Sequence, residues 1–171
     1  NSVRVFMHSK TLLISILVLC FGLGDGLNAQ NIVFSPVREF KADFNYPTDI
    51  CGNEKGDIFV LDGVNDRVVQ LKSGGEVVEI KPQRESIYKA VGIAWINGEL
   101  WIADTPRSRL LKMTLDGRIS EVIQLDHDTE PVDLIAVADH KIITDRMNHS
   151  ITVIDQNNKE KYYWGKRGEK I

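Results

Sequence analysis

Short apolar runs alternate with polar turns along most of this chain, and the alternation repeats at a fixed spacing. Three of the runs end in an aspartate that opens a polar turn: residues 57–62, 99–104 and 140–145. The closing aspartates lie 42 and then 41 residues apart. A period of roughly 40–45 residues, with several short strands in each unit, is typical of the blades of a β-propeller.

Each unit divides into four short apolar runs, and the pairs Asn97-Gly98 and Asp116-Gly117 supply the positive φ angles that tight hairpin turns require. The second run of each unit is continuously apolar, which predicts a strand buried between neighbouring blades. Trp95 and Trp101 are therefore expected to pack between blades. Because no helical period is sustained after residue 30, the chain is predicted to be all-β. The expected strands are 48–51, 58–61, 67–71 and 76–80; 92–95, 100–103, 109–114 and 119–124; and 132–136, 141–144, 150–154 and 160–164.

The units resemble the NHL repeat of six-bladed β-propellers in the TolB-like superfamily, whose pattern is Pro-x-Asp-Ile…Gly-x-Ile-x-Val-x-Asp-x-x-Asn-x-Arg-Val. The second unit departs from it with Arg107 in place of the asparagine and no leading proline, and the third has Ser150 in place of the arginine. The resemblance covers residues 46–168 and implies four-stranded blades. The first unit matches it at Pro47, Asp49, Ile50, Gly56, Ile58, Val60, Asp62, Asn65 and Arg67.

The expected organisation is three blades preceded by a leader. Residues 1–29 are upstream residues plus a signal peptide, residues 30–45 are an N-terminal segment that supplies a closing strand, and residues 165–171 are a linker to a further blade. The blades are predicted at 46–81, 89–125 and 130–164. Because closed propellers have about 4–8 blades, we expect the N-terminal part of a longer, six-bladed propeller. A symmetric pair of three-bladed halves is the alternative.

The leader predicts export. A short basic start at Met7–Lys10 precedes an apolar stretch over residues 11–24, and Ala29 offers a cleavage point. The stretch is shorter than the roughly 20 residues that span a bilayer, so no stable membrane span is expected after cleavage. An uncleaved anchor is the alternative. The predicted location is periplasmic or extracellular, and Cys51, the one cysteine left after cleavage, is expected to be buried.

Charge argues against nucleic acid as a partner. The chain has 21 Lys+Arg and 24 Asp+Glu, a formal net charge of −3. Acidic and basic residues are interspersed, and the sequence contains no basic stripe of the kind that follows a phosphate backbone.

The repeated aspartates Asp62, Asp104 and Asp145 have two interpretations. A ring of carboxylates could bind a cation. A residue found in every blade is more often structural, so we expect each carboxylate to accept backbone hydrogen bonds in the following turn and to pair with the arginine five residues later.

The first strands carry the weak metal candidates Asp49 and Asp133, because first strands line the central channel of a propeller. The family resemblance implies that related six-bladed enzymes hold calcium or zinc there. Calcium prefers about 6–8 oxygen ligands and zinc a tetrahedral set, which two aspartates do not supply. No cofactor is therefore expected for this chain, and calcium or zinc is reserved for a complete propeller.

Polar residues near the turns after the second strands are the predicted recognition surface, because such loops form the binding face of propellers. We expect a binding module for a protein, peptide or glycan rather than an enzyme, since the sequence contains no complete nucleophile–base or metal set. The alternatives are a metal-dependent hydrolase or lyase of the lactonase or peptide-amidating type with its site in the central channel, and a sensor domain joined to a further module. The predicted binding residues are Asn65, Arg67, Arg107, Arg109, Arg146, Asn148 and His149.

Overall fold

The computed structural model describes residues 3–4, 39–84 and 86–165, and in them the chain is built from three four-stranded antiparallel sheets. Each sheet is formed by four consecutive strands, so the prediction of an all-β fold with four-stranded blades is confirmed. The one helical element among these residues is the short 3₁₀ turn Thr105–Arg107. None of the helical structure described is long and apolar enough to cross a membrane.

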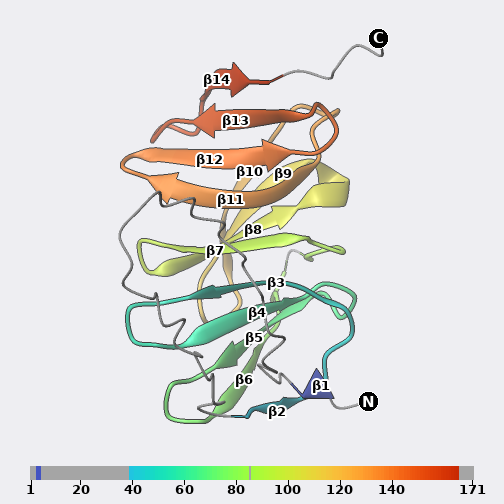
Figure 1. Cartoon of the computed structure of the whole chain (residues 1–171), viewed down its shortest axis with the longest axis vertical. Coiled ribbons are helices and arrows are strands. Elements are labelled where there is room, and N and C mark those ends of the chain that lie inside the picture. The colour runs from blue at the N-terminus through green and yellow to red at the C-terminus, as the bar shows by residue number, and fades with distance from the viewer. Residues whose placement is uncertain (1–2, 5–38, 85, 166–171) are drawn as a thin grey trace, which may run out of the picture.

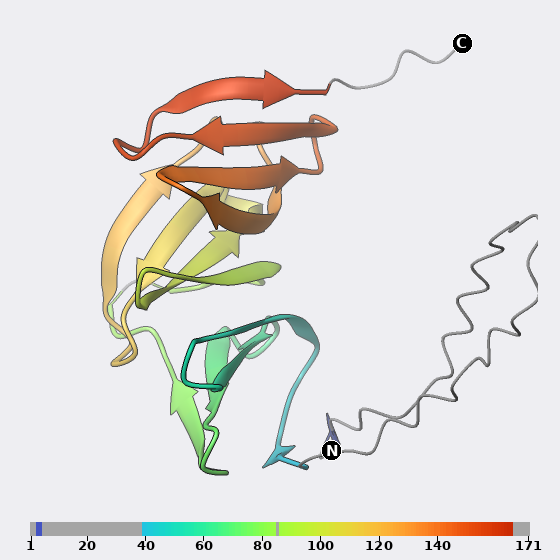
Figure 2. The same ribbon diagram turned by 60° about the vertical axis from the view of Figure 1, so that its left-hand side comes forward.

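The blades follow one another along the long axis of the molecule (Figure 1) and fan out along an arc (Figure 2). The first strands of successive blades, β3, β7 and β11, lie side by side. Blade 1 comprises β3 (Pro47–Gly52), β4 (Ile58–Asp62), β5 (Arg67–Leu71) and β6 (Val77–Ile80). Blade 2 comprises β7 (Gly92–Ile96), β8 (Glu99–Asp104), β9 (Arg109–Met113) and β10 (Ile119–Gln124). Blade 3 comprises β11 (Pro131–Val137), β12 (His140–Asp145), β13 (Ser150–Ile154) and β14 (Glu160–Trp164).

The core consists of layers between blades, and this explains the continuously apolar second strands. Side chains of a strand point alternately to its two faces. In β8, Leu100 and Ile102 join a cluster shared with blade 1, while Trp101 and Ala103 join a cluster shared with blade 3. Both faces of this strand are therefore buried, as the sequence predicts. Trp95 also packs between blades, with its ring stacked on Phe59 at a centroid distance of 5.1 Å.

The outer faces of the two end blades differ. On blade 1, Phe44 lies in a buried cluster with Val60, Val69 and Leu71, so the segment before the blade covers that face. On blade 3, apolar side chains on the face turned away from blade 2 remain exposed, among them Ile135, Ile151 and Trp164.

The described part of the N-terminal segment, residues 39–45, forms one short strand. Strand β2 (Lys41–Ala42) pairs with β1 (Val3–Arg4) rather than with a blade. The predicted signal peptide, residues 30–38 of the predicted N-terminal segment and most of the predicted linker at 165–171 lie outside the described residues.

Gly92 explains why blade 2 has no aspartate where blades 1 and 3 carry Asp49 and Asp133. Strand β11 approaches β7 so closely that a Cβ on Gly92 would overlap the carbonyl oxygen of Val132 and lie 2.9 Å from the Cα of Asp133. Both neighbours are backbone atoms, which cannot rotate away. A side chain at this position would push blades 2 and 3 apart.

We expect Gly92→Ala to lower the free energy of unfolding by roughly 1–3 kcal/mol, the usual cost of overpacking. Equilibrium urea denaturation of the full-length protein measures this. Gly74→Ala is the matched control, because a Cβ on Gly74 meets no atom within 4 Å and its φ is not positive. Equal stability of the two variants would contradict the proposed close approach.

Candidate functional site

The aspartate that ends β4 fastens the following turn to the segment before the blade. Asp62 is buried, and its Oδ1 accepts a hydrogen bond from the backbone N–H of Asn45 at 2.8 Å. Its Oδ2 accepts from Nδ2 of Asn65 at 2.8 Å and from Nε of Arg67 at 2.9 Å. Arg67 also pairs with Glu79 at 2.5 Å. Its guanidinium therefore joins the second, third and fourth strands of blade 1.

In blade 3, the repeated aspartate is hydrogen-bonded without an arginine. Oδ1 of Asp145 accepts from the backbone N–H groups of Glu130 and Met147, both at 3.0 Å, and Oδ2 accepts from Nδ2 of Asn148 at 2.6 Å. Arg146 extends outward to Glu130, with Nε 2.9 Å from Oε2. The asparagine and the backbone amides replace the charge that Arg67 supplies in blade 1.

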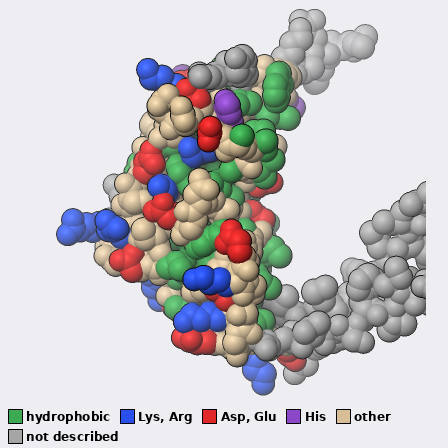
Figure 3. Space-filling view, turned by 90° about the vertical axis from the view of Figure 1, so that its left-hand side faces the viewer, with side chains coloured by type: hydrophobic (Ala, Val, Ile, Leu, Met, Phe, Trp, Pro, Cys, Tyr) green, Lys and Arg blue, Asp and Glu red, His purple; other side chains and the backbone are tan. Residues whose placement is uncertain are grey.

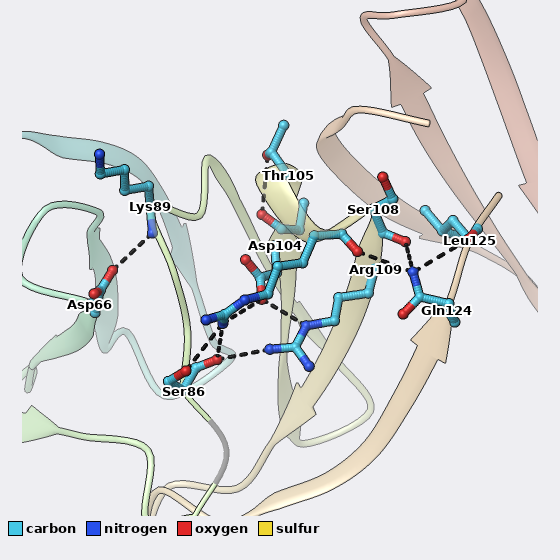
Figure 4. Close-up of polar contacts among 11 residues, drawn as sticks. Asp66, Ser86, Lys89, Asp104, Thr105, Ser108, Arg109, Gln124 and Leu125 are labelled. Carbon is cyan, nitrogen blue, oxygen red and sulfur yellow. Dashed lines mark hydrogen bonds and ion pairs between the residues drawn. The ribbon is translucent and has the colours of Figure 1, made fainter. Parts of the chain in front are cut away.

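Blade 2 is the exception (Figure 4). Oδ2 of Asp104 accepts from Nε of Arg109 at 2.8 Å and lies 3.5 Å from a terminal nitrogen of Arg107, and both guanidiniums also donate to the carbonyl of Ser86. The buried Oδ1 of Asp104 has no hydrogen-bond partner among the described residues. The two arginines of this blade therefore compensate a carboxylate that lacks a backbone donor.

The structure brings the predicted recognition residues to one side of the blades, and most of them are already engaged within the chain. Asn65, Arg67, Arg109 and Asn148 bond to the repeated aspartates, as described above. Arg107 is partly buried and lies over the ring of Tyr88, at 5.1 Å from its centroid. Arg146 and His149 are exposed.

Apolar side chains on the same turns carry a signal that the sequence interpretation missed. Two positions after each repeated aspartate stands an apolar residue, Val64, Pro106 or Met147, and all three are exposed. Val64 and Met147 keep 47% and 49% of their surface accessible. The spacing is visible in the sequence, but exposure is what separates these residues from the core.

An apolar pocket of about 290 Å³ opens on this side between blades 1 and 2. A Cβ on Gly63 would lie 2.9 Å from the carbonyl oxygen of Ala90, so the glycine allows this turn to approach the segment before β7 closely. Tyr46, at its rim, is 74% exposed. The lining residues are Tyr46, Thr48, Gly63, Val64, Lys89 and Val91.

The channel side carries the two metal candidates on a groove of about 450 Å³ formed by the first strands. Oδ1 of Asp49 accepts from the N–H of Ile50, and Oδ2 accepts from the N–H of Ile93 in the next blade, both at 2.8 Å. Burial raises the pKa of Asp49, and the charge of Asp133 adds to the rise. Asp133 is exposed, and its Oδ1 accepts from the N–H of Leu134 at 2.7 Å.

These side chains do not form a calcium or zinc site by themselves. Both oxygens of Asp49 already accept backbone N–H groups, and calcium needs about 6–8 oxygen ligands. Within the described part of the chain, no three His, Cys, Asp or Glu side chains gather closely enough to hold a metal. Cys51 lines the same groove, where burial raises the pKa of its thiol to about 12. The thiol is therefore protonated at neutral pH and is a poor nucleophile.

Comparisons with known proteins agree with this fold. No protein-family profile and no curated sequence matches the chain. Selenomethionine-substituted virginiamycin B lyase from Staphylococcus aureus superposes with a TM-score of 0.64 at 18% identity, over 77% of this chain and 46% of the lyase. Apo AztD from Citrobacter koseri superposes with a TM-score of 0.53 at 14% identity, over 77% of this chain and 40% of AztD.

These similarities define the class as a β-propeller. At identities below 20% they show the fold alone. The chain spans less than half the length of either of these proteins.

The Asp104–Arg109 pair allows a test of the repeated aspartate. We expect Asp104→Asn and Arg109→Gln each to destabilise the protein by about 3 kcal/mol, because each removes one member of a largely buried ion pair. The double variant should lose less than the sum, with a coupling energy of about 0.5–3 kcal/mol in urea denaturation. The exposed pair Lys72–Glu76 is the matched control and should show coupling near zero. Additive losses at Asp104 and Arg109 would contradict the role assigned to this pair.

Proposed function

We propose that this chain is part of an exported, NHL-type β-propeller that binds a protein or peptide through the face formed by the turns after the second strands. The observation that carries the proposal is the exposed apolar residue two positions after the repeated aspartate, Val64 in blade 1 and Met147 in blade 3. Nothing in the blade core requires an apolar side chain at an exposed turn. Exposed apolar side chains on a rigid turn are typical of a recognition surface.

The pocket beside Val64 indicates the chemistry of the partner. Its walls are mainly apolar, and it has room for one aliphatic or aromatic side chain. Lys89 lies at its edge and carries its ammonium 5.3 Å from the centroid of the Tyr88 ring. A peptide that inserts an apolar side chain next to an acidic residue would complement both features.

The buried polar residues on this face support the surface indirectly. The ion pairs of Arg67 and Arg109 fix the turns from below, so the exposed side chains are presented in a defined arrangement. The exposed Arg146 and His149 provide polar contacts on the blade 3 part of this surface. A rigid surface loses little conformational entropy on binding, which favours affinity.

Selection of a displayed peptide library on the full-length protein tests the proposal. We expect the selected peptides to bind about tenfold more weakly to Val64→Asp, a loss of about 1.4 kcal/mol of binding free energy. Val122→Asp is the matched control, because Val122 is 44% exposed but lies on the outer strand β10.

Two outcomes would contradict this assignment. Peptides that bind wild type and Val64→Asp equally would place the recognition surface elsewhere. Binding confined to a glycan array, with no peptide selected, would replace the peptide by a carbohydrate ligand.

The second candidate is a metal-dependent hydrolase or lyase of the lactonase or peptide-amidating type with its site in the central channel. The groove that presents Asp49 and Asp133 favours it, and the fold is shared with a lyase. The remaining ligands would come from residues outside those described.

Metal analysis of the full-length protein separates the candidates. The enzyme predicts stoichiometric calcium or zinc that is lost in Asp133→Asn, a variant that keeps the local acceptor for the N–H of Leu134. A metal-free protein that still binds its selected peptides would exclude the metal-dependent enzyme.

A further inference from the structure

A second cavity lies between blades 2 and 3, on the face that carries the turns between first and second strands. Its volume is about 240 Å³. Strand β8 begins at this face and ends at Asp104, so the cavity is on the side opposite the proposed recognition surface. Figure 3 looks onto this face, where basic and acidic side chains and a histidine gather in the upper part of the molecule. The cavity is lined by Ile96, Asn97, Trp101, Lys112, Glu121, Ala136, Ala138, Asp139, His140, Lys141, Gln156 and Asn158.

Two lysines from adjacent blades lie over one buried indole in this cavity. Trp101 is 4% exposed, and the ammonium groups of Lys141 and Lys112 lie 4.5 Å and 5.8 Å from the ring centroid. Both distances are within the range of cation–π attraction. The two ammonium groups therefore lie near each other, beside the same indole in the lining of the cavity.

Each lysine is fixed by a second contact. Nζ of Lys112 lies 2.5 Å from Oε2 of Glu99, which balances its charge. Nζ of Lys141 donates to Oδ1 of Asn158 at 3.0 Å, and Asn158 in turn donates to Oε1 of Glu121. The partner of Lys141 in this hydrogen bond is a neutral amide, and an ammonium group has three N–H donors.

This placement disfavours the charged form of Lys141. Burial lowers the pKa of its ammonium group, and the charge of Lys112 lowers it further, while Glu121 and Asp155 act in the opposite direction. A carboxylate placed beside Lys141 would accept its remaining N–H donors and stabilise the charged form.

The acidic residues of the lining determine what else the ligand must carry. Glu121 and the exposed Asp139 contribute negative charge to the same cavity, and His140, the first residue of β12, also lines it. A simple anion would complement Lys141 but face these carboxylates, and a simple amine would complement the carboxylates but face Lys141. Only a molecule with both charges complements both sides.

We infer that this cavity binds a small zwitterion of the α-amino acid class, with its carboxylate on Lys141 and its ammonium group toward Glu121 and Asp139. The side chain of the ligand would lie against Ile96 and Ala136, which are among the apolar residues of the lining. The cavity is built from blades 2 and 3 alone, so it does not depend on the proposed recognition surface.

Isothermal titration calorimetry of the full-length protein with L-leucine and L-glutamine tests the inference, because the two have apolar and polar side chains of similar size. We expect one of them to bind. For leucine, the single-charge analogues 4-methylpentanoate and 3-methylbutylamine should bind at least about tenfold more weakly, since each loses one charged contact. Lys141→Met and Glu121→Gln should each weaken amino acid binding by about the same factor.

Lys72→Met is the matched control, because Lys72 is a partly exposed lysine paired with Glu76 on blade 1, away from the cavity. It should leave binding unchanged, and all variants should keep the thermal transition of the wild type. Failure of both amino acids to bind at millimolar concentration would overturn the inference. Equal binding of either single-charge analogue, or equal binding by Lys141→Met, would overturn it as well.

Discussion

The buried carboxylate at the end of each second strand is the interaction on which the rest of the structure depends. It marks the end of the strand, and its oxygens accept hydrogen bonds from the turn, from the third strand in blades 1 and 2, and from the backbone before the blade in blades 1 and 3. Leaving such a carboxylate buried without donors would cost several kcal/mol. Each blade therefore supplies donors, but not the same ones: Arg67 and Asn65 serve Asp62, while Asn148 and backbone amides serve Asp145. The carboxylate is present in all three blades, while the groups that donate to it differ from blade to blade.

Contacts between blades follow a similar principle at the first strands. Asp49 accepts the N–H of Ile93 in the next blade and so joins blade 1 to blade 2 through a side chain. Blades 2 and 3 are joined instead by direct backbone approach at Gly92. Asp133 repeats the local geometry of Asp49 at the face of blade 3 where Ile135 and Ile151 are exposed. At this position of the first strand, neighbouring blades are therefore joined either by a carboxylate that accepts a backbone N–H of the next blade or by a glycine that permits direct backbone contact. Neither arrangement requires a ligand.

The sequence predicts the four-stranded blades, but it does not predict which polar residues on their surfaces are already paired, for a physical reason. Blade strands are specified locally, by turn residues such as Asn97-Gly98, with φ of 51° and 86°, and by apolar runs that must be buried on both faces. Whether a polar residue is free to bind depends on partners distant in sequence. The sequence predicts Arg67 as a recognition residue, but Glu79 and Asp62 enclose its guanidinium. Val64 and Lys141 show the converse: no local pattern distinguishes an exposed valine from a core valine, or a lysine held over an indole from a solvated one.

The two faces of the chain consequently place different demands on a ligand. On the turns after the second strands, the charged groups neutralise one another below the surface, and the accessible residues beside the pocket are mainly apolar. On the opposite face, Lys141 and Glu121 line a cavity in which positive and negative side chains lie side by side. The second strands contribute to both faces. Each of them ends at a buried aspartate on one face and begins on the other face, where its first residues do not have to satisfy a buried carboxylate. The repeat therefore fixes the buried polar contacts at one end of every blade, whereas the residues at the other end are free to differ between pairs of blades.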